Sequence, residues 1–194
     1  MEINNETGIE NKPVKHTKEL FKNTLYYGLM LAGAMILLDL LSYTFDFSGL
    51  GMFFGFVMLV IILAIYIGFF IWAGRTYRNK FYNGYINYGN AFVFCLLMAV
   101  VSVLVLALYY YVFYSFFDPE RAANETQKAI EMIQNNDFIP DENKEEAIQG
   151  MMEKMTTAKI VTNTLISSFI RGVILGAIAA LFIRKREKIN DVVL

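Results

Sequence analysis

The stretch AFVFCLLMAVVSVLVLALYYY, residues 91–111, decides the fold of this chain. It contains no charged residue, no glycine and no proline. A helix of about 20 apolar residues, rising about 1.5 Å per residue, crosses the roughly 30 Å hydrocarbon core of a bilayer. This stretch therefore predicts a membrane-spanning helix.

Three further windows have the same character: Thr24 to Thr44, Leu50 to Ala73 and Val161 to Ile183. The chain has 17 basic and 18 acidic residues, and the four windows contain only Asp39 and Arg171 among them. Charged residues make up 18% of the chain, against about a quarter in soluble proteins. This pattern excludes a soluble globular domain, a disordered chain and a membrane β-barrel. It predicts an all-α membrane protein, a four-transmembrane-helix bundle.

The distribution of charge outside the windows predicts the topology, because basic residues near span ends favour the cytoplasmic side. Basic clusters occupy residues 15–22, 75–80 and 184–188, whereas residues 118–160 carry ten acidic and five basic residues. We expect a cytoplasmic N-terminal arm (1–23), spans one to three (24–117), an external acidic helical insert (118–160), span four (161–183) and a basic cytoplasmic tail (184–194). The polar start and long first apolar run favour a retained span over a cleaved signal peptide.

The insert is predicted to fold as an external amphipathic helical hairpin between spans three and four. Asp118-Pro119 is a helix start signal, and Pro140 begins a second helix after a break at residues 135–137. One face of the first helix carries Ala122, Thr126, Ala129, Ile130 and Ile133, and the second carries Ile148, Met151, Met152 and Met155. The methionine stripe is expected to pack on the first helix, although thioether side chains also suit an adaptable partner surface.

Asp39 and Arg171 form the candidate intramembrane ion pair. By helical rise, Asp39 lies about 22 Å and Arg171 about 15 Å from the inner surface, and their side chains lean toward each other. The alternative is that Arg171 extends to the outer interface while a neutral Asp39 bonds to Ser42 or Tyr43. Intramembrane charges are functional candidates because they are costly to insert.

A helix-packing stripe is predicted in the fourth span, where small residues recur every four positions. Its members are Ser168, Gly172, Gly176 and Ala180. Such stripes allow close helix approach, and packing inside one bundle is favoured over dimerisation, which stays open. Tyrosines gather where the third span meets either surface and are expected to form interfacial belts. They are Tyr77, Tyr82, Tyr85 and Tyr88 inside, and Tyr109, Tyr110, Tyr111 and Tyr114 outside.

The sequence contains no catalytic, cofactor-binding or metal-binding constellation. It has no Gly-rich phosphate loop and no paired-histidine zinc motif, and Cys95 and His16 are the only residues of their kinds. Cys95 is expected to serve packing. We therefore expect no enzyme activity and no cofactor.

Tyr77-Arg78-Asn79-Lys80, followed by the segment Gly84-Tyr85-Ile86-Asn87-Tyr88-Gly89-Asn90-Ala91-Phe92, resembles the loop and third-span entry of a bacterial four-span family. This family is the domain of unknown function forty-one ninety-nine. The similarity extends to the aromatic third-span end with Asp118-Pro119, the acidic insert, and Met151-Met152-Glu153-Lys154-Met155 before a Gly-rich last span. The resemblance implies a bacterial inner (cytoplasmic) membrane protein without an established activity. It carries over no catalytic residue.

Three functions remain as hypotheses. The first is a non-enzymatic accessory or scaffold component of the bacterial envelope, and the alternative is a small transporter or ion conduit that uses the Asp39 and Arg171 charges. A membrane enzyme that uses paired acids of the insert ranks last, because such pairs are usually solvated surface charge. The expected partners are the lipid bilayer, a protein that meets the external insert, and a second copy of the chain, with no nucleic acid.

Overall fold

The computed structural model describes residues 17–45, 51–136, 139–152 and 157–185. Its elements are α1 (Thr17–Phe45), α2 (Gly51–Phe81), α3 (Tyr88–Val112), the π-helical turn η2 (Phe113–Phe117), α4 (Arg121–Gln134), α5 (Asp141–Met152) and α6 (Thr157–Ile183). Four segments are long and apolar enough to cross a membrane: Thr17–Phe45, Gly55–Phe81, Tyr88–Phe117 and Val161–Ile183. The prediction of an all-α, four-helix membrane bundle is confirmed. The protein is therefore a multi-pass membrane protein whose apolar helices contact lipid.

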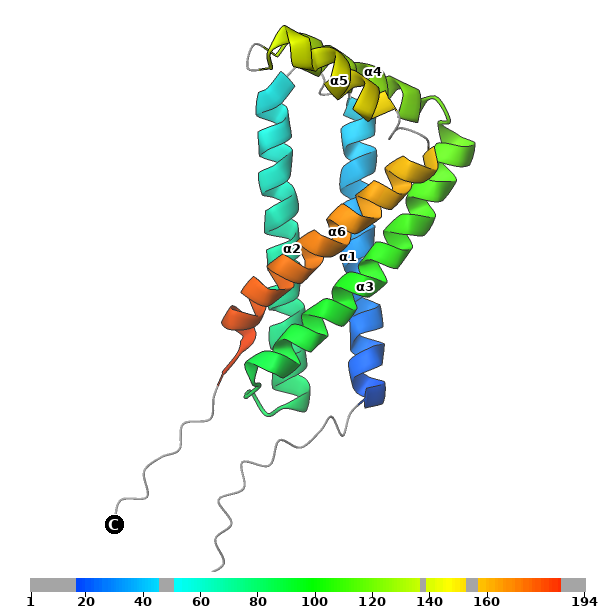
Figure 1. Cartoon of the computed structure of the whole chain (residues 1–194). Coiled ribbons are helices and arrows are strands. Elements are labelled where there is room, and N and C mark those ends of the chain that lie inside the picture. The colour runs from blue at the N-terminus through cyan, green and yellow to red at the C-terminus, as the bar shows by residue number, and fades with distance from the viewer. Residues whose placement is uncertain (1–16, 46–50, 137–138, 153–156, 186–194) are drawn as a thin grey trace, which may run out of the picture.

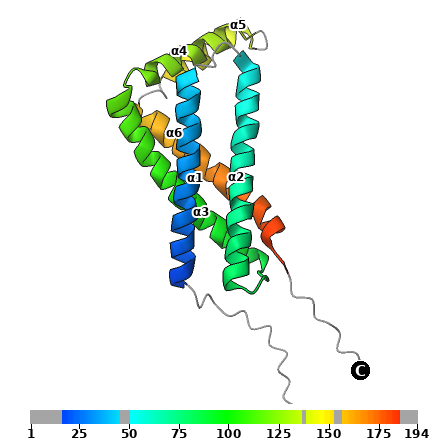
Figure 2. The ribbon, with the colours of Figure 1, turned by 180° about the vertical axis from the view of Figure 1, so that it is seen from behind.

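The neighbours of each long helix in the bundle do not follow the order of the helices along the chain. α3 and α6 lie side by side and run obliquely, whereas α1 and α2 are more upright (Figure 1). α1 packs mainly on α3, and α6 packs on α3 and α2. The view from behind places α1 in front of α6, the reverse of Figure 1, so these two helices lie on opposite sides of the bundle (Figure 2).

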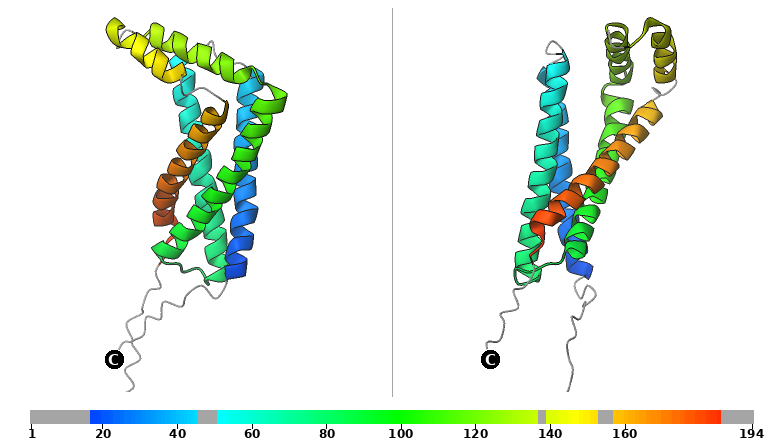
Figure 3. Two further views of the ribbon diagram at one scale, coloured as in Figure 1. Left: turned by 45° about the vertical axis from the view of Figure 1, so that its right-hand side comes forward. Right: turned by 60° about the vertical axis from the view of Figure 1, so that its left-hand side comes forward.

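The bundle has two chemically different ends. At the basic end, α1 begins, α6 ends, and residues 82–87 connect α2 to α3. At the hairpin end, α4 and α5 lie beside each other across the ends of the long helices (Figure 3). We use these two names below.

The two short helices of the hairpin end pack through one face of α4. Thr126, Ile130 and Ile133 are half-buried, as is Ile148 on α5. The Met152 side chain, however, is 60% exposed. The expectation that the methionine stripe is covered by the first helix is therefore wrong at Met152, and Met155 lies outside the described residues.

Close contact between α3 and α6 forms the centre of the core. All four stripe residues, Ser168, Gly172, Gly176 and Ala180, are buried. A Cβ atom added to Gly172 would lie 2.8 Å from the Ala99 Cβ atom, and one added to Gly176 would lie 3.2 Å from the Cys95 Cβ atom. The structure thus places the stripe against α3 of the same chain, and only side chains this small permit the approach.

Candidate functional site

The most highly connected polar cluster lies at the hairpin end and is built around Asp39 of α1. Both terminal nitrogens of Arg121 donate to its carboxylate, Nη1 to Oδ2 at 3.1 Å and Nη2 to Oδ1 at 3.0 Å. The Tyr109 hydroxyl of α3 donates to the same Oδ2 atom at 2.6 Å. The Arg121 and Asp39 side chains are only 13% and 17% exposed. A bidentate, largely desolvated pair of this geometry is among the stronger ionic contacts in proteins.

Aromatic rings surround the guanidinium group of Arg121. Its Cζ atom lies 4.9 Å from the ring centroid of Phe113, 5.2 Å from that of Tyr43 and 5.5 Å from that of Tyr114. A guanidinium over an aromatic face gains cation–π attraction, and the gain increases when the pair is desolvated. The rings also fix the plane of the guanidinium toward Asp39.

Asp118 joins the same cluster through both carboxylate oxygens. Oδ1 accepts a hydrogen bond from the backbone N–H of Arg121 at 3.0 Å, and Oδ2 accepts one from the Tyr43 hydroxyl at 2.9 Å. The first bond satisfies a free N–H group in the opening turn of α4, as expected of the Asp118-Pro119 start signal. The second bond ties that turn to α1. We call Asp39, Tyr43, Tyr109, Asp118 and Arg121 the hairpin clamp.

The π-helical turn η2 brings the clamp together. It extends α3 by residues 113–117 with a wider backbone, and the Asp118 N–H group then bonds the Phe113 carbonyl at 2.9 Å. Phe113 and Tyr114 are buried in this turn. Short π segments often occur where a helix must present side chains in an unusual register, frequently at functional sites. Here the turn directs the chain back over α1, so that Arg121 reaches Asp39.

The predicted pair between Asp39 and Arg171 is wrong. Asp39 pairs with Arg121, and Arg171 makes no hydrogen bond or ion pair with any residue in the described ranges. The physical reason is the packing order, because α1 and α6 both pack on α3 but lie on opposite sides of the bundle. The depths of Asp39 and Arg171 along the membrane normal were not enough to predict a pair, because depth does not determine where each helix lies around the bundle.

Arg121 is the member of the clamp that sequence reasoning missed. It is one of five basic residues in an acidic segment, and it lies outside the apolar windows in which a partner was sought. One signal could have found it. Asp39 lies in the half of its span that is nearer the hairpin end, and Arg121 follows the third span by only a few residues, shortly after Asp118-Pro119.

The tyrosine belts also need correction. Tyr111 is 57% exposed, and Tyr85 and Tyr88 are each 38% exposed, as belt residues would be. Tyr77 and Tyr114, however, are 1% and 5% exposed and belong to the core. Tyr77 stacks on Phe94 with ring centroids 4.5 Å apart. An interfacial position in the sequence does not distinguish a ring facing lipid from one facing the neighbouring helix.

A second set of contacts closes the basic end. Arg78 Nη1 donates to the Ile183 carbonyl at the end of α6 at 2.8 Å, and Ile86 and Lys185 exchange two backbone hydrogen bonds of 3.0 Å. The Asn87 side chain accepts from the Asn90 N–H group at 2.8 Å and so caps α3. Arg78, Ile86, Asn87 and Asn90 belong to the loop motif of residues 77–92. The contacts of this motif therefore join α2, α3 and the last span.

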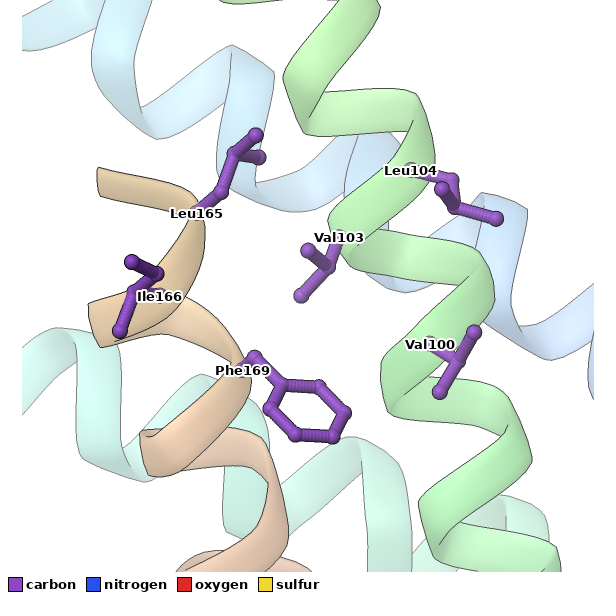
Figure 4. Close-up of a pocket in the computed structure, with 6 residues that line it drawn as sticks. All are labelled: Val100, Val103, Leu104, Leu165, Ile166 and Phe169. Carbon is purple, nitrogen blue, oxygen red and sulfur yellow. The ribbon is translucent and has the colours of Figure 1, made fainter. Parts of the chain in front are cut away.

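Other chemistry is sparse in the part of the chain that the structure describes. There, no three His, Cys, Asp or Glu residues are arranged to hold a metal ion. An apolar groove of about 310 Å³ lies between α3 and α6 (Figure 4). It is lined by Val100, Val103, Leu104, Leu165, Ile166 and Phe169, which suit an acyl chain of the surrounding lipid.

The hairpin presents an acidic surface. Asp141, Glu142, Glu145 and Glu146 on α5 are all exposed. Lys144 Nζ lies 2.7 Å from Asp141 Oδ1, and this hydrogen bond, followed by the attraction of the lysine charge, lowers the pKa of the Asp141 carboxyl. The α5 surface therefore carries negative charge at neutral pH.

Comparison with known proteins gives a family and no characterised relative. No curated protein and no solved structure matches the chain. The model of one family, described as protein of unknown function (DUF4199), matches residues 26–185. This range includes most of the first span, the other three spans, the hairpin clamp and the loop motif of the basic end. The chain therefore belongs to the DUF4199 family of proteins of unknown function.

Proposed function

We propose that the protein is a non-enzymatic accessory or scaffold component of the bacterial envelope, with the hairpin of α4 and α5 as its docking surface. In this proposal it resides in the inner (cytoplasmic) membrane with both termini in the cytoplasm. The hairpin then lies outside, in agreement with the basic residues at the opposite end. Its partner is a protein with a basic surface.

The observation that carries this proposal is the attachment of the hairpin to the bundle. A loosely tethered insert would need neither the bidentate ion pair between Arg121 and Asp39 nor the hydrogen bond between Tyr43 and Asp118. These contacts hold the first turn of α4 in a defined position relative to α1 and α3. A surface held in place loses less conformational entropy when it binds a partner than a flexible one does.

The chemistry of the exposed residues supports docking over catalysis. The acids of α5 lie on an exposed helix surface, and the Asp39 and Arg121 charges of the clamp already neutralise each other. The hairpin also exposes apolar side chains, with Met132 66% and Met152 60% exposed. Acidic groups beside exposed methionines suit a partner that combines basic and apolar residues.

The test is purification of the tagged protein from its own membranes in a mild detergent. We expect one stoichiometric protein to copurify with the wild type. It should be lost from a variant with Glu142→Lys, Glu145→Lys and Glu146→Lys, because these changes reverse the charge of the α5 surface. Arg75→Glu, at an exposed position of the basic end, is the matched control and should retain the partner.

Two outcomes contradict the proposal. One is that the same protein is recovered with the wild type and with the α5 charge-reversal variant. The other is that no partner copurifies and that proteoliposomes of the pure protein conduct ions or solutes. The second outcome would favour the alternative, a small transporter or ion conduit.

A further inference from the structure

One face of α2 at the basic end is left uncovered by the rest of the described chain. Gly68, Trp72, Arg75 and Asn79 follow one another at spacings of four, three and four residues, so helical geometry places them on the same face. All four positions are exposed. The opposite face carries Phe70, which is fully buried in the core. The exposed face of α2 therefore meets the surrounding lipid.

This face changes from apolar to charged toward the end of the helix. Gly68 leaves open space, because a Cβ atom added to it would meet no neighbouring helix or side chain within 4 Å. Trp72 is 50% exposed, and its ring centroid lies 5.3 Å from that of Tyr27 on α1 and 6.0 Å from that of Phe69. At about 1.5 Å per residue, Arg75 lies about 10 Å nearer the helix end than Gly68. An open apolar position, a supported aromatic ring and a cation thus follow one another along α2.

The charge at this end of α2 is positive and uncompensated. Residues 75–90 contain Arg75, Arg78 and Lys80 and no acidic residue. Arg75 has no hydrogen bond or ion pair with a residue in the described ranges. Arg78 is engaged, because its Nη1 atom donates to the Ile183 carbonyl at 2.8 Å and its Nε atom donates to Asn79 Oδ1 at 3.2 Å. The Asn79 amide is thus held through its oxygen, and its two N–H donors stay available one helical turn from Arg75.

We propose that this face of α2 binds one anionic phospholipid of the leaflet at the basic end. The Arg75 guanidinium can donate two parallel N–H bonds to the lipid phosphate, and the Asn79 amide adds further donors. The Trp72 ring lies at the depth of the glycerol and ester groups, where amphipathic rings are favoured, and an acyl chain covers Gly68. A zwitterionic lipid brings its own cation to the headgroup and gains less from Arg75.

The apolar part of the face decides the class of ligand. Gly68 and Trp72 belong to the membrane-spanning segment Gly55–Phe81, so an amphiphile within the bilayer reaches them. A dissolved anion would meet only the polar residues at the end of the helix. Basic groups at the membrane surface attract anionic lipid headgroups in many membrane proteins. The combination on α2 therefore fits a lipid better than a free phosphate.

Trp72 provides the measurement, because it is the only tryptophan of the chain. The full chain is reconstituted in vesicles of equal parts phosphatidylglycerol and phosphatidylcholine, with brominated acyl chains on one lipid or on the other. Bromine quenches tryptophan fluorescence only at close range, so the two quenching curves give the lipid preference beside Trp72. For the wild type we expect a preference of about fivefold for phosphatidylglycerol, which is typical of one arginine near an anionic surface.

Two pairs of variants test the site. Arg75→Gln should reduce the preference to less than about twofold. Arg184→Gln removes the same charge from an exposed position at the end of α6 and should leave the preference unchanged. Gly68→Leu should also lower the preference, because its side chain occupies the place of the acyl chain. Gly33→Leu is the matched control, because Gly33 of α1 is equally open. All four positions are exposed, so the variants should fold.

Three results would overturn the proposal. The first is equal quenching of wild-type Trp72 by the two brominated lipids. The second is an equal loss of preference in Arg184→Gln and Arg75→Gln, because the lipid would then respond to the total charge of the basic end and not to a site on α2. The third is that Gly68→Leu has no greater effect than Gly33→Leu.

Discussion

Replacing Asp39 with asparagine is the sharpest test of the hairpin clamp. The amide keeps an oxygen that can accept from Tyr109, so the change removes mainly the charge. Stranding one partner of a fully buried ion pair costs about 3 to 5 kcal/mol, whereas an exposed pair contributes about 0 to 1 kcal/mol. The Asp39 and Arg121 side chains are 17% and 13% exposed, so we expect a value near the lower end of the buried range. Asp39→Asn should therefore destabilise the protein by about 3 kcal/mol.

The assay is a double-mutant cycle of Asp39→Asn, Arg121→Gln and the double variant, measured by unfolding in detergent. A loss of about 3 kcal/mol lowers the Tm by roughly 9 °C for a chain of this size. Because each single variant breaks the same contact, the double variant should lose about 2 kcal/mol less than the sum of the two single losses.

A second cycle provides the matched control. Asp39→Asn combined with Arg171→Gln should give additive losses, to within about 0.5 kcal/mol, because α1 and α6 do not pack together. The reasoning is refuted if the Asp39 and Arg121 losses are additive. It is also refuted if coupling appears instead between Asp39 and Arg171.

Three further predictions concern topology, packing and the hairpin. A cysteine placed at Asn136 should react with an impermeant reagent in intact cells, while one at Asn79 should not. The single native cysteine, Cys95, is buried and should not contribute to the labelling. The reverse labelling pattern would show that the topology is the opposite one. Gly172→Ala should destabilise the bundle by about 1 to 3 kcal/mol, whereas Gly68→Ala, which meets no atom within 4 Å, should be neutral or slightly stabilising; equal effects on unfolding would contradict close packing of α3 and α6. Ile133→Asp should accelerate protease cleavage between α4 and α5 by exposing their half-buried contact, and rapid cleavage of the wild type would show that the hairpin is not stably packed.

The spans could be predicted from the sequence because their signal is local and additive. Each apolar residue adds its own transfer free energy, so a window such as residues 91–111 can be recognised as a membrane span without any knowledge of tertiary contacts. The four-residue recurrence of Ser168, Gly172, Gly176 and Ala180 is equally local, because helical geometry alone puts those residues on one face. The start of α4 directly after Asp118-Pro119 also follows from local hydrogen bonding, because the Asp118 side chain accepts from the N–H group of Arg121, the first residue of the helix.

The partners of those local elements were decided by the tertiary structure. The sequence places Asp39 and Arg171 at neighbouring depths, but their helices face different sides of the bundle. Arg121 reaches Asp39 only because η2 redirects the chain after α3. Likewise, Tyr77 and Tyr111 both lie near span ends, yet one is buried and the other exposed. The physical reason is that composition and helical period determine which face of a helix is apolar or small. Which neighbour covers that face depends on the rotation and crossing of several helices at once, and these are properties of the packed bundle.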